Sequence, residues 1–252
     1  MSGGLLAGRT AVVTGGSSGI GLASARLLAT EGATVTIAGR SEQRLAAAAE
    51  ELGPGTRWIA TDLSSAAGAA RLAAALREHG TTAIDILFAN AGASNAPELF
   101  DTTEETFDQV IDTNLKSTFF TVLECAGLLA DHASVILTAS VGYHNGRIGD
   151  PLYNAAKAGV RALGRGFAAQ PEFLQRSIRV NTVSFGAVAT PMTGAGAPEY
   201  EAALQEWAET EVPLRRWAEP VEAAGAVLFL AGPHSTYLTG AEIPVDGGLV
   251  QL

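Results

Sequence analysis

Short apolar segments alternate with longer segments of helical composition along the whole chain. The apolar segments, rich in Val, Ile and Thr, predict strands near residues 10–14, 34–38, 56–60, 84–88, 134–138, 178–183 and 242–245. Helices are expected between them at 20–31, 42–52, 66–79, 104–130, 152–169 and 220–231. Most strand segments are uninterrupted apolar runs, as in parallel strands covered on both faces. The pattern therefore predicts an α/β fold, with a single doubly wound parallel sheet of about seven strands and helices on both faces.

The length and composition of the chain fit one domain. A chain of 252 residues suits one large α/β domain better than two small ones, so residues 1–252 are expected to form a single domain. Apolar residues make up 47% and charged residues 17%, which predicts a large core and extensive buried or interface surface. The formal net charge of −10 argues against nucleic acids and anionic membranes as main partners.

The sequence predicts neither a metal site nor a membrane span. Cys125, the single cysteine, cannot form an internal disulfide and is expected to pack in the core, and no residues cluster with the spacing of metal ligands. The first six residues lack the charged and apolar regions of a signal peptide. No apolar run approaches the ~20 residues of a membrane span. A soluble, cytoplasmic protein is expected.

A glycine-rich turn follows the first strand segment. Residues 10–14 lead into Gly15-Gly16-Ser17-Ser18-Gly19-Ile20-Gly21 and then into an Ala- and Leu-rich helical segment. Glycines permit a tight turn, and the free N–H groups at the start of a helix attract an anion. An ordinary strand–helix turn can have this composition, but its place in the first unit of the chain favours binding of a dinucleotide phosphate. The candidate contacts are Gly15, Ser17, Ser18, Gly19, Ile20 and Gly21.

Tyr153 and Lys157 are spaced to lie on one face of a helix, and Ser140 precedes Tyr153 by thirteen residues. A cation beside a phenol favours the phenolate, which would bring the pKa of the tyrosine below its usual value of about 10. Ser140 can hold a substrate oxygen. A Tyr and a Lys at this spacing also occur on solvated helix faces, so the interpretation as proton-transfer residues depends on the neighbouring dinucleotide motif.

Together these motifs resemble those of the short-chain dehydrogenase/reductase family, in the family's order and spacing. The resemblance rests on Thr14-Gly15-x-x-x-Gly19-Ile20-Gly21, Asn90-Ala91-Gly92, Asn114, Ser140, Tyr153 and Lys157. It extends from about residue 6 to residues 245–248, which is nearly the whole chain. It implies a Rossmann-type sheet and a nicotinamide dinucleotide cofactor, but no particular substrate.

The resemblance also implies roles for single residues. Tyr153 would be the general acid in reduction and the base in oxidation, while Lys157 lowers its pKa and holds the nicotinamide ribose. Ser140 would orient the carbonyl, and Asn114 would hold a water that links Lys157 to solvent. Further cofactor contacts implied are Asp62 and Leu63 at the adenine, Asn90, Ala91 and Gly92 after the fourth strand, and Gly186, Val188 and Thr190 at the nicotinamide amide.

The second strand segment indicates which dinucleotide is preferred. NAD sites usually carry an acidic residue about 20 positions after the glycines, but here Gly39 takes that place and Arg40 follows it. A guanidinium can bind a 2′-phosphate with two hydrogen bonds, so NADP(H) is favoured over NAD(H). Ser17, Ser18 and Ser41 could add hydroxyl donors. The alternative is that Arg40 is a solvated residue at the end of a strand.

The chain departs from the family pattern at two places. Phe185 stands before Gly186 where the family usually has proline, which could place an aromatic ring near the substrate pocket or on the surface. Pro171 is expected to interrupt the helix at 152–169, and that helix commonly lies in a subunit interface of the family. The family nevertheless implies a homotetramer, and the apolar C-terminal residues 249–252 favour an oligomer.

The connection after the sixth strand segment, residues 186–212, is unusually long and is expected to form a substrate lid. Candidate pocket residues are Ala93, Ser94, Val141, Tyr143, His144, Asn145, Phe185, Met192 and Trp207, although His144 fits a loop residue exposed at the rim better than a substrate contact. Because they are mostly apolar or aromatic, the expected substrate is a small neutral molecule, a fairly apolar ketone or secondary alcohol. The expected function is an NADP(H)-dependent carbonyl reductase or alcohol dehydrogenase. The alternatives are a catalytically dormant NADP(H)-binding redox sensor and a scaffold subunit.

Overall fold

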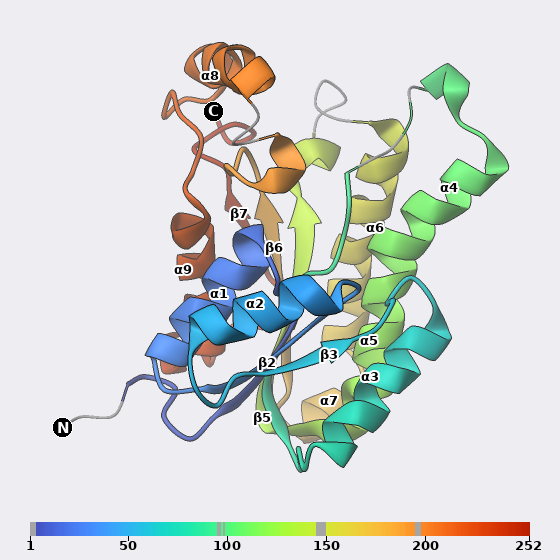
Figure 1. Ribbon diagram of the computed structural model, residues 1–252, viewed down its shortest axis with the longest axis vertical. Coiled ribbons are helices and arrows are strands. Elements are labelled where there is room, and N and C mark those ends of the chain that lie inside the picture. Colours follow the sequence, from blue (N-terminus) through green and yellow to red (C-terminus); the bar gives the residue numbers. More distant parts are fainter. Residues whose placement is uncertain (1–3, 95–96, 98, 145–149, 195–197) are drawn as a thin grey trace.

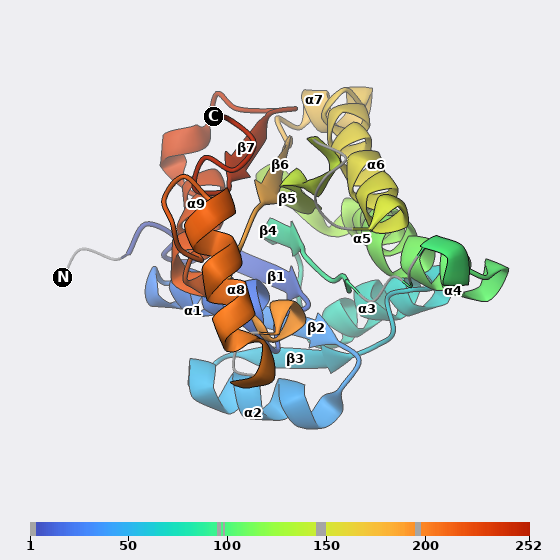
Figure 2. The same ribbon diagram turned by 90° about the horizontal axis from the view of Figure 1, so that it is seen from above.

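The protein is built on one seven-stranded parallel sheet (Figures 1 and 2). The computed structural model describes residues 4–94, 97, 99–144, 150–194 and 198–252. The strands are β1 (Thr10–Thr14), β2 (Thr34–Gly39), β3 (Arg57–Ala60), β4 (Ile84–Ala89), β5 (Leu129–Ser140), β6 (Arg179–Phe185) and β7 (Glu242–Val245). Their spatial order is β3-β2-β1-β4-β5-β6-β7, which confirms the predicted doubly wound α/β fold.

Helices cover both faces of the sheet (Figure 2). On one face lie α1 (Gly19–Thr30), α2 (Glu42–Leu52) and α9 (Pro220–Ala231). On the other lie α3 (Ala66–Glu78), α4 (Glu104–Ile111), α5 (Ser117–Cys125), α6 (Pro151–Ala168) and α7 (Pro171–Gln175). Helix α8 (Pro198–Glu211) lies above the carboxyl ends of the strands (Figure 1). The order of the strands reverses beside β1, and ligands of such sheets bind at the carboxyl ends near that reversal.

The sheet separates two apolar cores, because alternate residues of each strand point to opposite faces. Val12 and Leu87 belong to the core under α3, α5 and α6, whereas Val13 and Phe88 belong to the core under α1 and α9. Cys125 is buried in the first of these cores, as predicted. No helix in the described part of the chain is long and apolar enough to cross a membrane.

Helix α6 carries two candidate catalytic residues and lies close against the sheet. Asp150 caps its start by accepting hydrogen bonds from the backbone N–H groups of Leu152 (2.7 Å) and Tyr153 (3.0 Å). Further along, a side-chain carbon at Gly164 would clash with the hydroxyl group of Thr182 on β6. The missing side chain at Gly164 therefore allows α6 to approach the strands that end at the cavity.

Two predicted boundaries were wrong. The helix expected at 104–130 is divided by a π-helical turn (Asp112–Lys116), and its second part, α5, ends at Cys125. Strand β5 begins at Leu129 because it pairs there with Ile84 of β4, beyond a register shift that the local sequence does not reveal. The predicted lid segment 186–212 includes helix α8, which was not among the predicted helices.

Pro171 does not kink a continuous helix. Helix α6 ends at Ala168, and Pro171 is the first residue of the separate helix α7. Proline is favourable there because the first N–H groups of a helix have no partner within the helix. The ring of Phe173, two residues later, is buried in the core and fixes the short helix against the sheet.

Candidate active site

A cavity of about 930 Å³ opens at the carboxyl ends of the strands. It extends from the glycine-rich turn after β1 to the residues under α8, and all but two of the predicted catalytic and cofactor residues line it. The lining residues among them are Gly15, Ser17, Ser18, Gly19, Ile20, Gly21, Arg40, Asp62, Leu63, Asn90, Ala91, Gly92, Ser140, Tyr153, Lys157, Gly186, Val188 and Thr190. The two exceptions are Ser41 and Asn114.

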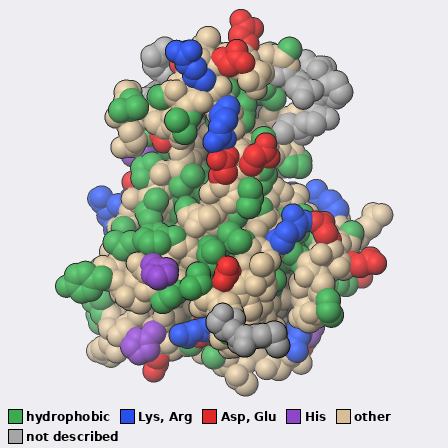
Figure 3. Space-filling model, turned by 90° about the vertical axis from the view of Figure 1, so that its left-hand side faces the viewer, with side chains coloured by type: hydrophobic (Ala, Val, Ile, Leu, Met, Phe, Trp, Pro, Cys, Tyr) green, Lys and Arg blue, Asp and Glu red, His purple; other side chains and the backbone are tan. Residues whose placement is uncertain are grey.

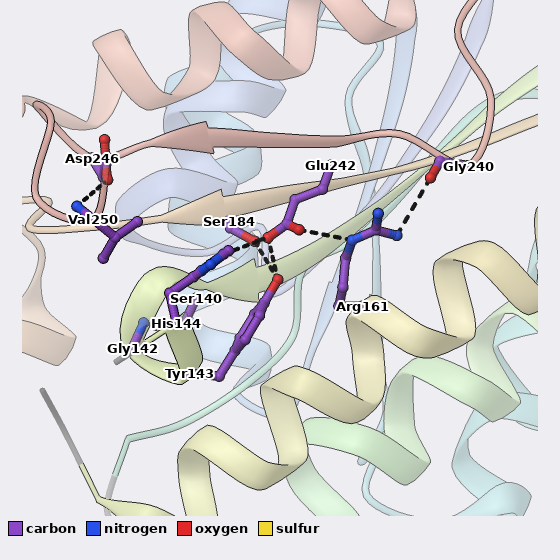
Figure 4. Close-up of polar contacts among 10 residues, drawn as sticks. All are labelled: Ser140, Gly142, Tyr143, His144, Arg161, Ser184, Gly240, Glu242, Asp246 and Val250. Carbon is purple, nitrogen blue, oxygen red and sulfur yellow. Dashed lines mark hydrogen bonds and ion pairs between the residues drawn. The ribbon is translucent and has the colours of Figure 1, made fainter. Parts of the chain in front are cut away.

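Ser140, Tyr153 and Lys157 meet at the middle of this cavity. Ser140 ends β5 and forms a hydrogen bond with Tyr153, which lies in the first turn of α6. The backbone N–H of Gly142 donates to Ser140 Oγ at 3.2 Å (Figure 4). Lys157 Nζ lies 5.7 Å from the centre of the Tyr153 ring and donates to the carbonyl oxygen of Thr138 at 3.1 Å.

The pKa values in this group differ from the sequence-based expectation. Burial raises the pKa of Tyr153 to about 12, and the hydrogen bond with Ser140 lowers it by less than burial raises it. Burial also lowers the pKa of Lys157 to about 8. The prediction that Lys157 depresses the pKa of Tyr153 is therefore not met in this structure, because desolvation of the phenol dominates. A protonated tyrosine is, however, the form that a general acid needs.

Asn114 lies in the π-helical turn and is buried behind the cavity lining, next to Gly92. Its side-chain amide donates to the carbonyl oxygens of Ala93 (2.9 Å) and Val110 (3.0 Å) and accepts from the N–H of Ala93 (3.2 Å). Both of its N–H groups are thus used by backbone, and its visible role is to hold the chain that follows β4. A side-chain carbon at Gly92 would lie 2.8 Å from Asn114 Oδ1 and 3.2 Å from Lys157 Nζ, so a glycine is needed for these groups to come together.

The glycine-rich turn is shaped to accept an anion. Gly15 has a φ of +66°, a conformation that favours glycine, and a side chain at Gly21 would clash with the backbone of Gly15. The side chain of Ser18, the residue before α1, accepts no hydrogen bond from the start of that helix. The N–H groups of the first helical turn therefore remain available to an anion in the cavity. Thr14 Oγ1 accepts from the N–H of Asn90 at 2.9 Å and so ties this turn to the chain after β4. These residues fit the phosphates of a dinucleotide.

The far end of the cavity carries two arginines. Arg40 follows β2, and Arg44, which was not predicted as a cofactor contact, lies in the first turn of α2 and also lines the cavity. The available signal was its position at the start of the predicted helix 42–52, shortly after Arg40. Ser41 was expected to contact the cofactor, but its hydroxyl accepts the backbone N–H of Arg44 at 3.3 Å and caps α2. Ser41 stands directly before α2, whose first backbone N–H groups have no partner within the helix, and serine is a preferred capping residue at that position.

The end of the cavity under α8 is mostly apolar. Ala93, Ser94, Val141, Phe185, Met192 and Trp207 line it, as predicted. Tyr143 and His144 do not, because both side chains turn to Glu242 of β7 (Figure 4). Asn145 lies outside the described residues. Leu204, Trp217 and Leu249 also line this end but were not predicted, because they come together only in the folded chain.

Two tryptophans form part of the apolar wall. The ring centres of Trp207 and Trp217 lie 5.5 Å apart, and the indole N–H of Trp217 donates to the carbonyl oxygen of Leu204 at 2.8 Å. Because this hydrogen bond satisfies the polar group of Trp217, its ring can face the cavity as an apolar surface. Leu249 packs against the same cluster, whereas the terminal Leu252 is 96% exposed.

Residues 15–250 match the family model described as enoyl-(acyl carrier protein) reductase. The chain is 38% identical over 250 residues to the oxidoreductase asL5 of Sarocladium schorii, with 98% of each protein covered. This match over full length decides the family. The chain is a short-chain dehydrogenase/reductase. As a member of this family, it is an NAD(P)-dependent oxidoreductase.

Other members of the short-chain dehydrogenase/reductase family are similar over the same length. The 3-oxoacyl-[acyl-carrier-protein] reductase FabG of Chlamydia muridarum is 35% identical over 255 residues, which cover 97% of this chain and 98% of that protein. The solved structure of the Pseudomonas aeruginosa RhlG/NADP active-site complex has a TM-score of 0.89 and 35% sequence identity, with 99% of this chain and 100% of that chain covered. The enzyme thus resembles proteins whose names indicate carbonyl reduction or NADP binding.

Proposed function

We propose that this enzyme reduces a neutral, fairly apolar ketone to a secondary alcohol with NADPH, and catalyses the reverse oxidation. The observation that carries the proposal is the layout of a single cavity. The hydroxyl groups of Ser140 and Tyr153 lie at its middle, two arginines lie at one end, and an apolar wall lies at the other. Each region suits one part of the reaction: proton transfer, recognition of a phosphorylated cofactor, and substrate binding.

The proposed mechanism assigns one task to each polar side chain. Bound NADPH supplies the hydride that the carbonyl carbon receives. Tyr153 gives its phenolic proton to the carbonyl oxygen, and Ser140 donates a hydrogen bond to the same oxygen as negative charge develops there. Lys157 holds a positive charge beside Tyr153 and contacts the cofactor ribose. Asn114 acts through Gly92 and Ala93 by fixing the chain next to Lys157.

The preference for NADP(H) is supported by Arg40 and Arg44, which both line the end of the cavity opposite the tryptophans. Two guanidinium groups match the charge of a 2′-phosphate, and no carboxylate stands at Gly39 to repel it. Asp62 and Leu63 line the cavity nearby, where the proposal places the adenine. Gly186, Val188 and Thr190 are proposed to contact the nicotinamide amide.

The apolar wall supports the substrate class. We propose that the chain forms a single domain and that the segment 186–212 acts as its substrate lid. Met192, Leu204 and Trp207, which line the cavity, belong to this segment. Together with Phe185 and Trp217 they offer an aromatic and aliphatic surface next to Ser140. Among the described residues, the cations that line the cavity are Arg40, Arg44 and Lys157, and all three belong to the proposed cofactor region. The described part of the lining therefore gives little attraction for an anionic substrate.

The proposed function is tested by following NADPH absorbance with a panel of aliphatic and aromatic ketones, with NADH in parallel. The panel should include a 3-oxoacyl thioester, because relatives are named for that substrate. We expect turnover of apolar ketones and a preference for NADPH. Turnover of the thioester alone would contradict the substrate class. Tight NADPH binding without any turnover would instead indicate a redox sensor or a scaffold subunit.

We further propose that the enzyme forms a homotetramer. Several large apolar side chains are exposed on the monomer, including Phe107, Phe119, Phe229 and Tyr237. Figure 3 shows hydrophobic side chains gathered over the side of the molecule that carries α9, with charged side chains set between them. Burying such surface in a symmetric assembly is favourable. Light scattering at micromolar concentration should give the mass of four subunits, and the mass of one subunit would contradict the proposal.

Lys157 is expected to lower the stability of the cofactor-free protein. A lysine with a lowered pKa binds its proton less tightly in the folded state, so the stability of the wild type rises as pH increases from about 8 to 10.5. Lys157→Met should therefore melt at a higher temperature than the wild type at pH 7, and the difference should shrink toward pH 10.5. Each kcal/mol corresponds to roughly 2–4 °C for a chain of this size. Thermal melts at both pH values measure the effect.

The exposed Lys116, which pairs with Asp112 at 3.0 Å, provides the matched control, because Lys116→Met should not raise the melting temperature. Lys157→Met should also lose both NADPH affinity and turnover. If Lys157→Met melts at or below the wild-type temperature at pH 7, contacts of Lys157 in the folded protein must offset the cost of burying its charge. Normal NADPH affinity would exclude the contact with the cofactor ribose.

A further inference from the structure

Glu242, on the edge strand β7, collects polar contacts from three other parts of the fold (Figure 4). One oxygen, Oε1, accepts from the hydroxyl of Ser184 at 2.6 Å, bonds to the hydroxyl of Tyr143 and lies 3.0 Å from Nε2 of His144. The other, Oε2, accepts from Nε of Arg161 at 2.8 Å. The side chain is 15% exposed and does not line the cavity. Its position therefore suits an indirect effect on the active site.

Tyr143 and His144 belong to the short helical turn Val141–His144 that directly follows Ser140. Their rings are stacked, with centres 4.5 Å apart, and both polar atoms reach the same carboxylate oxygen. The turn also contains Gly142, whose N–H donates to Ser140 Oγ. Holding the two rings therefore holds the backbone group that orients the catalytic serine hydroxyl.

Arg161 connects Glu242 to the other half of the active site. It lies on α6 four residues after Lys157 and eight after Tyr153, so the three side chains follow one face of the helix. Its side chain is 12% exposed, and the guanidinium also donates to the carbonyl oxygen of Gly240 at 3.4 Å. The charged pair thus joins the face of α6 that carries Tyr153 and Lys157 to the edge strand.

The charge states of Glu242 and its partners keep their contacts in place at neutral pH. Burial tends to raise the pKa of Glu242, but hydrogen bonds from Ser184, Tyr143, His144 and Arg161 outweigh it and bring the pKa to about 2. Burial and the contact with Glu242 raise the pKa of Tyr143 to about 12, so its hydroxyl remains a donor. The carboxylate of Glu242 is therefore ionised at neutral pH, and both of its oxygens are in polar contacts.

We propose that Glu242 is a positioning residue that holds Ser140 and the Tyr153–Lys157 face of α6 in register with each other. The inference rests on the proposed reductase function, because the register matters only if these groups act together. A carboxylate shared between the turn after β5 and helix α6 fixes the distance between them more tightly than two separate contacts would. Misplacement of catalytic groups by about 1 Å can cost up to ~100-fold in rate.

Three variants test the proposal: Glu242→Ala, Glu242→Gln and the control Asp85→Asn. Asp85 is a similarly buried carboxylate, 17% exposed, that binds Arg9 at 2.6 Å and the N–H of Thr10 at 2.9 Å. It lies on β4 at the end of the sheet opposite the cavity. We expect Glu242→Ala to lower kcat about 10- to 100-fold with KM for NADPH little changed, Glu242→Gln to fall between it and the wild type, and Asp85→Asn to keep wild-type kcat.

A double-mutant cycle with Ser140→Ala separates positioning from loss of stability. If Glu242 acts by orienting Ser140, Glu242→Ala should lower kcat much less in the Ser140→Ala background than in the wild type. A purely structural effect would lower kcat by the same factor in both backgrounds. Equal factors, or a kcat of Glu242→Ala equal to the wild type, would overturn the proposal.

A measurement independent of turnover keeps the test decisive. Amide hydrogen exchange in residues 140–144 should become faster in Glu242→Ala and remain unchanged in Asp85→Asn. Only Glu242→Ala loses the contacts that hold Tyr143 and His144. Unchanged exchange in Glu242→Ala would overturn the proposal even if the variant folds poorly elsewhere. If the wild type turns over no ketone, the reductase function fails, whereas faster exchange in residues 140–144 would still support the tie.

Discussion

A Tyr153→Phe variant is expected to lose nearly all turnover while binding NADPH as the wild type does. The substitution removes the oxygen that gives its proton to the substrate and leaves the ring and the helix in place. General acid–base catalysis contributes about 10²- to 10⁴-fold, so kcat should fall by that factor. Steady-state rates with the best ketone of the panel, and NADPH titrations followed by cofactor fluorescence, measure the two effects.

The fully exposed Tyr237 offers a matched control, since Tyr237→Phe removes the same atom from a residue that does not line the cavity. Its kcat should equal that of the wild type. If Tyr153→Phe kept more than about a tenth of the wild-type kcat, the general acid would have to be another group. Weak NADPH binding by the variant would indicate a larger part for the phenol in holding the cofactor.

Changing Arg40 should shift the cofactor preference from NADPH toward NADH. Arg40→Ala removes a charge-assisted contact, and the expected loss is about 10- to 150-fold. It should appear mainly in KM for NADPH, because the 2′-phosphate is remote from the reacting atoms. Since Arg40 is exposed, the wild-type preference should also weaken as salt concentration rises. Kinetics with both cofactors at two salt concentrations check the prediction.

The double variant Gly39→Asp with Arg40→Ala should go further, because a carboxylate repels the phosphate and can accept a hydrogen bond from the free 2′-hydroxyl of NADH. Gly39 has room for a side chain: a carbon placed there would lie 3.8 Å from Leu45 Cδ2, an ordinary contact. Arg165→Ala, an exposed change on α6, serves as the control for loss of one positive charge. A wild type that already prefers NADH would contradict the assignment of Arg40.

The sheet and the residues around the cavity could be predicted because both depend on local sequence. Each strand of a parallel sheet is buried on both faces, so its apolar run is visible without knowing its neighbours. The glycine-rich turn, Ser140, Tyr153 and Lys157 carry spacings that reflect backbone geometry over a few residues. What failed at β5 was a boundary set by pairing between Leu129 and Ile84, which lie far apart in the sequence.

Contacts between distant segments explain the remaining errors. Tyr143 follows Ser140 closely and was expected in the pocket, and His144 was expected at its rim, yet Glu242, about a hundred residues later, draws both rings away. Trp217 and Leu249 reach the apolar wall only through the fold of the segment around α8. The pKa of Tyr153 depends on how deeply it is buried, and no local pattern reveals that depth.

The close approach of α6 to the sheet at Gly164 limits how this enzyme could be made more stable. Replacing a glycine inside a helix by alanine normally favours folding by about 0.5–1 kcal/mol. At Gly164 the added carbon would collide with Thr182 and push the helix outward, and Tyr153 and Lys157 would move with it. A selection for heat resistance alone would therefore draw on other helical positions, such as Gly166, where nothing lies within 4 Å of an added carbon. In α6, alanine at Gly166 should therefore stabilise the helix without moving the active site. Gly164, two residues earlier, must stay a glycine because it sets the position of Tyr153 and Lys157.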